Sequence, residues 1–237
     1  MDLCDFFVPT DAPDYLSARR TLPQNTFFPV SATASRSWVL CADETAGASS
    51  LAFNFCCARA LKCGGDCVTL FISARLSQPA VPPPTTSPSS TTKQFPPPLL
   101  CQGKIPAADV LQHVLVKHVS TSEQLVEVLS GIHMMPAPVG TIVLDGLDSI
   151  PSIRSKTFHL ALALLENAAE WAAEKVPSCV SLATTSAKPQ LALPPSAPLV
   201  SAVPLSAPKR FQLSVSGSDC AVEYEINTVT KAFSLVK

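Results

Sequence analysis

Short apolar runs separated by longer amphipathic segments dominate the first three quarters of the chain. Four such runs lie at 37–41, 68–72, 141–145 and 179–183. Continuous apolar runs of this length are typical of strands that are buried on both faces of a parallel sheet. Between them, apolar residues recur every three or four positions over 47–62 and 155–175, which predicts amphipathic helices. This alternation predicts an α/β fold with a mostly parallel central sheet flanked by helices.

The rest of the pattern adds a strand and a helix in the middle of the chain and further strands at its end. Residues 113–119 alternate polar and apolar side chains, as a strand does, and Ser120 with Glu123 predicts a capping box for the helix that follows. Three short apolar segments, at 211–215, 221–226 and 232–236, follow one another at the spacing of a meander. We therefore expect antiparallel strands at the C-terminal end.

Proline divides the chain, since 23 of its 237 residues are proline. We expect residues 1–36 to form an extended N-terminal arm, because proline interrupts any long helix there. Phe6 and Phe7 are apolar anchors in this arm, which either packs on its own domain or docks on another protein. Residues 37–237 then form one domain, with proline-rich insertions at about 77–106 and 186–208 that we expect to be disordered or extended.

Composition narrows the class of function. Lys plus Arg total 17 and Asp plus Glu total 18, so the net charge of −1 excludes a polybasic nucleic-acid binder, and any contact with DNA must be local. Charged residues make up 15% of the chain against a usual share of about 25%, which suggests that a partner covers part of the surface. The nine cysteines lie scattered in apolar segments, which is typical of reduced thiols in a cytosolic or nuclear protein. No membrane span and no signal peptide are expected.

The turn at 42–49, between the first strand and the first helix, is the place where a phosphate-binding loop would lie. Gly47 and Ser49 are in register with the pattern G-x-x-x-x-G-K-[ST]. Ala42 replaces the first glycine and Ala48 replaces the lysine. Because that lysine supplies the positive charge that faces the phosphates, its loss weakens the case for nucleotide binding.

Acidic residues in and beyond the loop bear on the same question. Asp43 and Glu44 add two negative charges, which oppose the attraction of an anion to the helix start. Asp145 ends the apolar run at 141–145, where a Walker B aspartate would hold Mg²⁺. We expect its strand to be the parallel neighbour of the strand that precedes the loop.

In the order and spacing of these elements, residues 38–237 resemble the RecA-like recombinase paralogues. The likeness is closest to the small ATPase-like partners of SWIM zinc-finger proteins in Shu-type recombination-mediator complexes. It runs through the loop, the segment Val-Thr-Leu-Phe-Ile-Ser-Ala-Arg that ends at Arg75, the segment Ile-Val-Leu-Asp-Gly-Leu-Asp that ends at Asp148, the helix that contains Trp171, and the final meander. The resemblance implies a RecA-like core of the P-loop type.

The same resemblance assigns the chemical groups one by one. The family's loop lysine falls on Ala48, and its catalytic glutamate falls on Arg75. Phosphoryl transfer depends on positioning and charge neutralisation, so we expect no catalytic residue and no or very weak ATP hydrolysis. The family's members are regarded as ATPases stimulated by single-stranded DNA, which leaves enzyme activity open. We expect no cofactor, with ATP and Mg²⁺ as the alternative, and a vestigial nucleotide pocket made of Gly47, Ala48, Ser49, Ser50 and Asp145.

RecA-like proteins face DNA with two loops, one after the Walker B strand and one after the next strand. By position these loops fall at about 149–157 and 186–210 here. Their basic residues are the contacts that the resemblance implies for single-stranded DNA: Arg154, Lys156, Lys188, Lys209 and Arg210. So few phosphate contacts would give weak, salt-sensitive binding without sequence preference.

The first hypothesis is therefore a non-catalytic or weakly active RecA-like subunit in the nucleus. It would form a heterodimer with a SWIM-type zinc-finger protein, support a recombinase or its paralogues in homologous-recombination repair, and bind single-stranded DNA. One alternative is an active DNA-stimulated ATPase with a variant loop. Another is an α/β adaptor without a DNA role, whose proline-rich loops recruit SH3- or WW-type modules. A metal site is not predicted, because only Cys63 and Cys67 have a suitable spacing.

Overall fold

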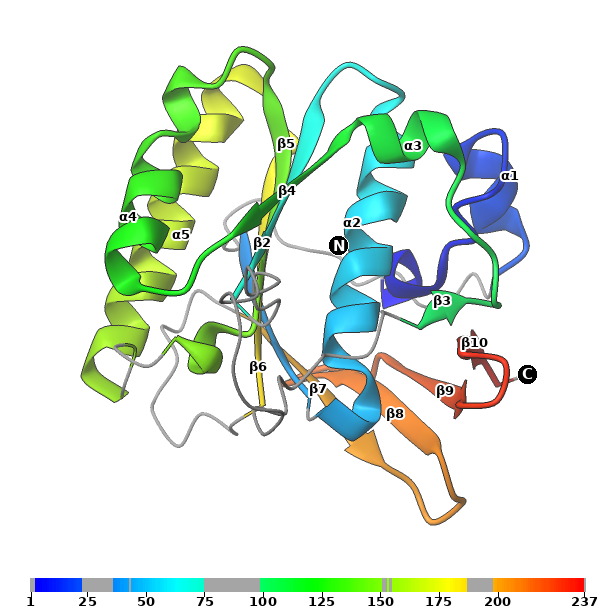
Figure 1. Ribbon diagram of the computed structural model, residues 1–237. Helices are drawn as coiled ribbons and strands as arrows, with labels where there is room; N and C mark the ends of the chain where they lie inside the picture. The colour runs from blue at the N-terminus through cyan, green and yellow to red at the C-terminus, as the bar shows by residue number, and fades with distance from the viewer. Residues whose placement is uncertain are drawn as a thin grey trace, which may run out of the picture.

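Ten strands of the described residues form one mixed sheet in the order β3-β10-β9-β8-β7-β1-β6-β5-β2-β4 (Figure 1). The computed structural model describes residues 3–22, 36–42, 44–74, 99–150, 153, 155–186 and 198–236. The parallel part consists of β1 (Ser37–Cys41), β2 (Val68–Ser73), β4 (Val114–His118), β5 (Val139–Asp145) and β6 (Val180–Thr185). The other part consists of β3 (Leu100–Cys101), β7 (Leu199–Pro204), β8 (Arg210–Val215), β9 (Ala221–Asn227) and β10 (Ala232–Leu235).

The apolar runs form the central strands, as their pattern predicts. Every residue of β1, β2 and β5 is buried. Successive side chains point to opposite faces of a strand, so Trp38 and Leu40 contribute to one half of the core while Val39 contributes to the other. The expected α/β class, with a mostly parallel centre and antiparallel strands at the C-terminal end, is confirmed.

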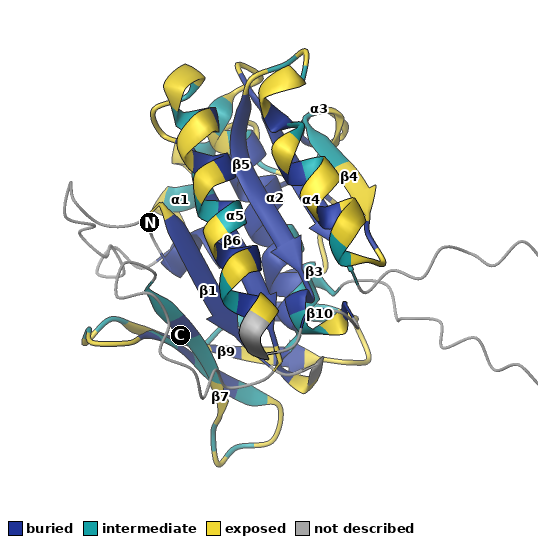
Figure 2. Ribbon diagram, turned by 90° about the vertical axis from the view of Figure 1, so that its left-hand side faces the viewer, coloured by how far each residue is buried: buried dark blue, intermediate teal, exposed yellow. Residues whose placement is uncertain are grey.

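Helices cover both faces of the sheet. On one face lie α2 (Ala48–Cys63), the 3₁₀ turn η1 (Leu3–Phe7), α1 (Tyr15–Arg20) and α3 (Ala108–Gln112). On the other face lie α4 (Ser122–Ser130), the 3₁₀ turn η3 (Ile132–Met134) and α5 (Ser155–Lys175). Figure 2 shows α4 and α5 with buried sides toward the strands and exposed sides toward solvent. None of the helices in the described ranges is long and apolar enough to cross a membrane.

The sheet order corrects one expectation about neighbouring strands. β5, which ends at Asp145, is not adjacent to β1, because β6 pairs with both of them in parallel. A second correction concerns α4, which begins one residue later than the predicted capping box. Thr121 is the N-cap, its hydroxyl accepts a hydrogen bond from the backbone N–H of Gln124, and the Gln124 side chain accepts from the N–H of Ser120.

Residues 3–22 of the N-terminal segment are not extended. η1 is fully buried, and Asn54 of α2 donates from its side-chain amide to the carbonyl groups of Phe6 and Val8. Phe6 lies with its ring centroid 5.1 Å from that of Phe55. This part therefore packs on its own domain, which was one of the two readings. Residues 23–35 lie outside the described ranges.

Both proline-rich insertions contain a strand that the sequence did not predict. Within 77–106, the short β3 pairs in parallel with β10, and Cys101 is buried. Within 186–208, β7 pairs in parallel with β1 and antiparallel with β8. It thereby joins the C-terminal meander to the central sheet. Residues 75–98 and 187–197 lie outside the described ranges.

Candidate functional site

The loop between β1 and α2 turns through a short 3₁₀ segment, η2 (Glu44–Ala46), and a left-handed glycine. Gly47 has φ 72° and is the N-cap of α2, and its carbonyl accepts the first helical hydrogen bond from Leu51 at 2.9 Å. A positive φ of this size strains residues that carry a Cβ. The glycine that the sequence placed in register with a phosphate loop thus has a backbone role in starting the helix.

The structure brings together the Ser49 hydroxyl and the Asp145 carboxylate, two of the predicted pocket residues. Ser49 donates to Oδ1 of Asp145 at 3.0 Å. Thr184 of β6 donates to the same oxygen at 2.8 Å, and the Gly146 backbone N–H donates to the Thr184 hydroxyl at 2.7 Å. Asp145 is only 1% exposed. These hydrogen bonds link Ser49, Asp145, Thr184 and the Gly146 backbone in one connected network.

The position of β6 explains how this network forms. β6 lies between β1 and β5, so its C-terminal end sits between the loop and Asp145. Thr184 and Thr185 are both buried there, and the Thr185 carbonyl accepts from the Ala42 backbone N–H at 3.0 Å. The sequence identified Ser49 and Asp145, but it gave no role to Thr184.

The C-terminal meander closes over the loop from outside. The Tyr224 hydroxyl of β9 donates to the Ala46 carbonyl at 2.8 Å, and a Cβ added at Gly47 would lie 3.3 Å from Cδ1 of Ile226. The hydroxyl of Ser50 accepts from the Leu99 backbone N–H at 2.8 Å. Ser50, predicted as a pocket residue, is therefore engaged in holding the segment that leads into β3.

The described residues do not fit a bound triphosphate well. Ser49 and Asp145 provide the oxygen atoms that a Mg²⁺ ion prefers. Ala48, at the lysine position, is 1% exposed and belongs to the apolar cluster that also contains Ala46, Tyr224 and Ile226. The loop therefore lacks the cationic side chain that would balance the phosphates, and no phosphoryl-transfer step is assigned to it. Asp43, the Glu44 side chain and Arg75 lie outside the described part of the chain.

Two of the five predicted DNA contacts have side chains that the structure describes. β7 runs parallel to β1 and continues beyond the pairing of Cys41 with Ser201, so the β7–β8 turn projects past the edge of the sheet where Asp145 lies (Figure 1). Lys209 lies in this turn and donates to the Thr228 hydroxyl at 2.8 Å, while Arg210 is 3.8 Å from the Glu225 carboxylate. Arg154, Lys188 and the Lys156 side chain are outside the described residues, so these contacts stay predictions.

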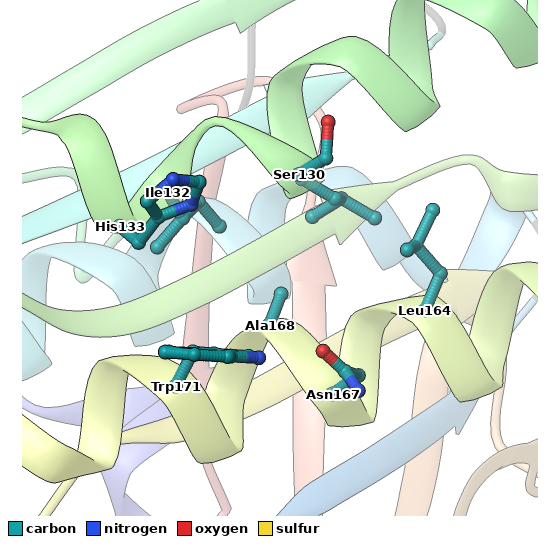
Figure 3. Close-up of a pocket in the computed structure, with 8 residues that line it drawn as sticks. Ser130, Ile132, His133, Leu164, Asn167, Ala168 and Trp171 are labelled. Carbon is teal, nitrogen blue, oxygen red and sulfur yellow. The ribbon is translucent and has the colours of Figure 1, made fainter.

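A second feature lies away from the loop, between α4 and α5. The two helices and η3 border an open pocket of about 290 Å³, which Leu164 and Trp171 line from α5 and His133 lines from η3 (Figure 3). The sequence singled out the helix that contains Trp171 without giving its indole a role. Across the described ranges, no three His, Cys, Asp or Glu side chains are grouped so that they could hold a metal ion.

Comparison with known proteins shows a likeness in fold. The crystal structure of the RadB recombinase superposes with a TM-score of 0.54 at 9% sequence identity, over 86% of this chain and 93% of that chain. No protein-family model and no curated protein sequence matches this chain. The architecture is therefore RecA-like, and the likeness lies in the fold.

Proposed function

We propose that this protein is a non-catalytic, RecA-like subunit of a recombination-mediator complex, which pairs with a SWIM-type zinc-finger protein in the nucleus and binds single-stranded DNA. One observation carries the proposal: a RecA-like fold retains the Ser49–Asp145 pair but has a buried alanine at the lysine position. Such a subunit has the fold of an ATPase but acts by binding its partners and does not transfer phosphoryl groups. A recombinase or one of its paralogues is the proposed recipient of that support.

The catalytic part is tested with a phosphate-release assay in the presence of single-stranded DNA. The expected result is no turnover above background for the natural chain and for Asp145→Ala. Turnover that Asp145→Ala abolishes would establish the alternative, an active ATPase with a variant loop, which the preserved Ser49–Asp145 contact favours. A nucleotide-induced rise in Tm would point the same way, because a ligand that binds only the folded state stabilises it.

The DNA part is tested at the β7–β8 turn. Lys209→Glu combined with Arg210→Glu should weaken binding of a single-stranded oligonucleotide and flatten its salt dependence, since each lost phosphate contact lowers the salt slope by about one. The matched control is Lys62→Glu combined with Lys175→Glu, which reverses two charges at the other edge of the sheet. These lysines lie in the last turns of α2 and α5. Equal affinity for both double variants in a mobility-shift titration would remove these residues from the DNA site.

The partner is tested by co-expression. The chain should purify in a stoichiometric complex with a SWIM zinc-finger protein and be less soluble alone. Recovery of a stable, monodisperse monomer with no affinity for that protein would favour the remaining alternative, an adaptor without a recombination role.

A further inference from the structure

An apolar groove runs between α4 and α5 on the face of the sheet that does not carry α2. Its floor consists of buried Leu129 and Ala168, and its walls are Leu164 and Trp171 on one side and His133 on the other. The rings of His133 and Trp171 lie with centroids 6.2 Å apart, at the end of the groove where η3 leads into β5. Figure 3 shows both rings turned toward the space between the helices.

Exposed apolar side chains extend the groove along both helices. Trp171 is 55% exposed, Leu160 is 69% exposed, and Val126 on α4 is 50% exposed. Leu160, Leu164 and Trp171 recur at helical spacing, so they mark one side of α5 over about 16 Å. That length corresponds to about three turns of a helix laid alongside.

Acidic side chains border this apolar strip. Glu123 and Glu127 are exposed one turn apart on α4, and Glu170 and Glu174 are exposed one turn apart on α5. The described basic side chains of these helices are fewer, and Lys175 lies with its Nζ 3.4 Å from the His133 carbonyl. The surroundings of the groove are therefore apolar in the middle and negative at the sides.

We propose that this groove docks a basic amphipathic helix of a partner protein. An apolar stripe on that helix would fill the space between Leu164 and His133 and cover the indole of Trp171, while its Lys or Arg side chains would face the four glutamates. The negative border disfavours nucleic acid, and it disfavours a second copy of this chain because the same face would meet itself. The groove lies where β5 begins, and the Ser49–Asp145 pair lies where β5 ends, so docking here goes beyond the proposed function and does not depend on it.

The probe is a fluorescein-labelled synthetic peptide of about five turns, with Leu at positions i, i+3, i+4 and i+7 on one face and Lys on the other. The peptide should bind the full chain saturably in fluorescence anisotropy. Trp171→Ala should weaken binding by about tenfold, as expected of a central aromatic anchor. Glu170→Lys combined with Glu174→Lys should weaken it by a similar factor and remove most of its salt dependence. Both sites are exposed, so the variants are expected to fold.

A second readout is the tryptophan fluorescence of the protein, measured while an unlabelled form of the same peptide is added. The chain has two tryptophans, of which Trp38 is 2% exposed. Binding should shift the emission of the natural chain to the blue, and Trp171→Phe, which leaves only Trp38, should abolish the shift.

Two controls make the outcome decisive. Val229→Ala removes an apolar side chain that is 89% exposed elsewhere, and Asp219→Lys with Glu223→Lys reverses two exposed charges on the meander. Neither control should change the affinity, and a peptide with Glu in place of Lys should not bind. The proposal is overturned if the Lys peptide fails to bind, if the Glu peptide binds equally, or if the control variants weaken binding as much as the groove variants do.

Discussion

The hydroxyl of Ser49 donates to Oδ1 of Asp145 at 3.0 Å, although 96 positions of sequence separate the two residues. In P-loop NTPases a loop hydroxyl and a Walker B aspartate hold Mg²⁺, and these are the roles that the sequence resemblance implies for the two residues. Here they belong to a hydrogen-bonded chain that continues through Thr184 to the backbone of Gly146. We therefore expect the pair to contribute to the stability of the fold.

Asp145→Ala should lower the free energy of unfolding by about 1–3 kcal/mol, because it removes a buried acceptor from two hydroxyl donors. Asp145→Asn should cost less, since the amide oxygen still accepts. The measurement is urea unfolding followed by circular dichroism. Asp219→Ala, at an exposed position, is the control and should stay within about 0.5 kcal/mol of the natural chain. An Asp145→Ala variant as stable as this control would show that the hydrogen-bonded chain contributes nothing.

Gly47→Ala should destabilise the protein more than Gly64→Ala. Both glycines have positive φ, 72° and 61°, so alanine is strained at either site by about 1–2 kcal/mol. A Cβ at Gly47 would also lie 3.3 Å from Cδ1 of Ile226, whereas a Cβ at Gly64 meets nothing within 4 Å. The difference in Tm between the two variants therefore measures how tightly Ile226 of β9 packs against the loop at Gly47. Ile226→Val should reduce that difference; if it does not, the contact is not the cause.

Gly140→Ala should destabilise the protein, because the added methyl group has no space in the sheet. Gly140 lies in buried β5, and a Cβ added there would be 2.2 Å from Sγ of Cys67. Overpacking of this kind costs about 1–3 kcal/mol. Cys67→Ala removes the clashing sulfur atom, so the double variant should recover much of the loss. A double-mutant cycle measured by urea unfolding checks this coupling. Additive effects of the two changes would contradict the close packing of these residues.

The thiols should fall into two groups in alkylation by iodoacetamide. Burial raises the pKa of Cys57, Cys101 and Cys179 to about 12, and it also raises the pKa of Cys56. The thiolate is the reactive form, so at pH 8 these groups should label only when the protein opens. The partly exposed Cys63 and Cys220 should label first in time-resolved peptide mass spectrometry. Early labelling of Cys179 would contradict this order.

The same pKa shifts predict how stability depends on pH. A thiol whose pKa is raised in the folded state keeps its proton there while the unfolded chain loses it. Stability is therefore fully present below the ordinary value of 9.0 and declines as the pH rises from there toward about 12. Urea midpoints measured from pH 7 to pH 10 should begin to fall above pH 8.5. Replacing Cys57 by Ala should make that fall shallower.

The central strands were predictable because their signal is local. Runs such as those of β1, β2 and β5 are buried on both faces, and this burial requires continuous apolar sequence. β7 was missed because Pro204 ends it and proline surrounds it, while its pairing with β1 is specified by residues far away in the chain. β3 has two residues, too few for any periodicity to appear.

The candidate site was predictable to the same extent. Asp145 ends one apolar run, and Ser49 lies in the first turn of the helix that follows another. A parallel sheet brings the carboxyl ends of its strands to one edge, which is where such residues meet. The closure of the loop by Tyr224 was not visible, because its bond to Ala46 spans 178 positions and no local pattern encodes it. The exposure of Trp171 was equally hidden, since it depends on how much of α5 is covered by α4.

The two ends of the described chain share one aromatic cluster. The ring of Phe7 lies 5.4 Å from that of Tyr224 and 5.9 Å from that of Phe233, measured between centroids. Phe7 precedes both of its ring partners by most of the described chain. Phe7 therefore lacks these two ring contacts until the segment from Tyr224 to Phe233 has left the ribosome.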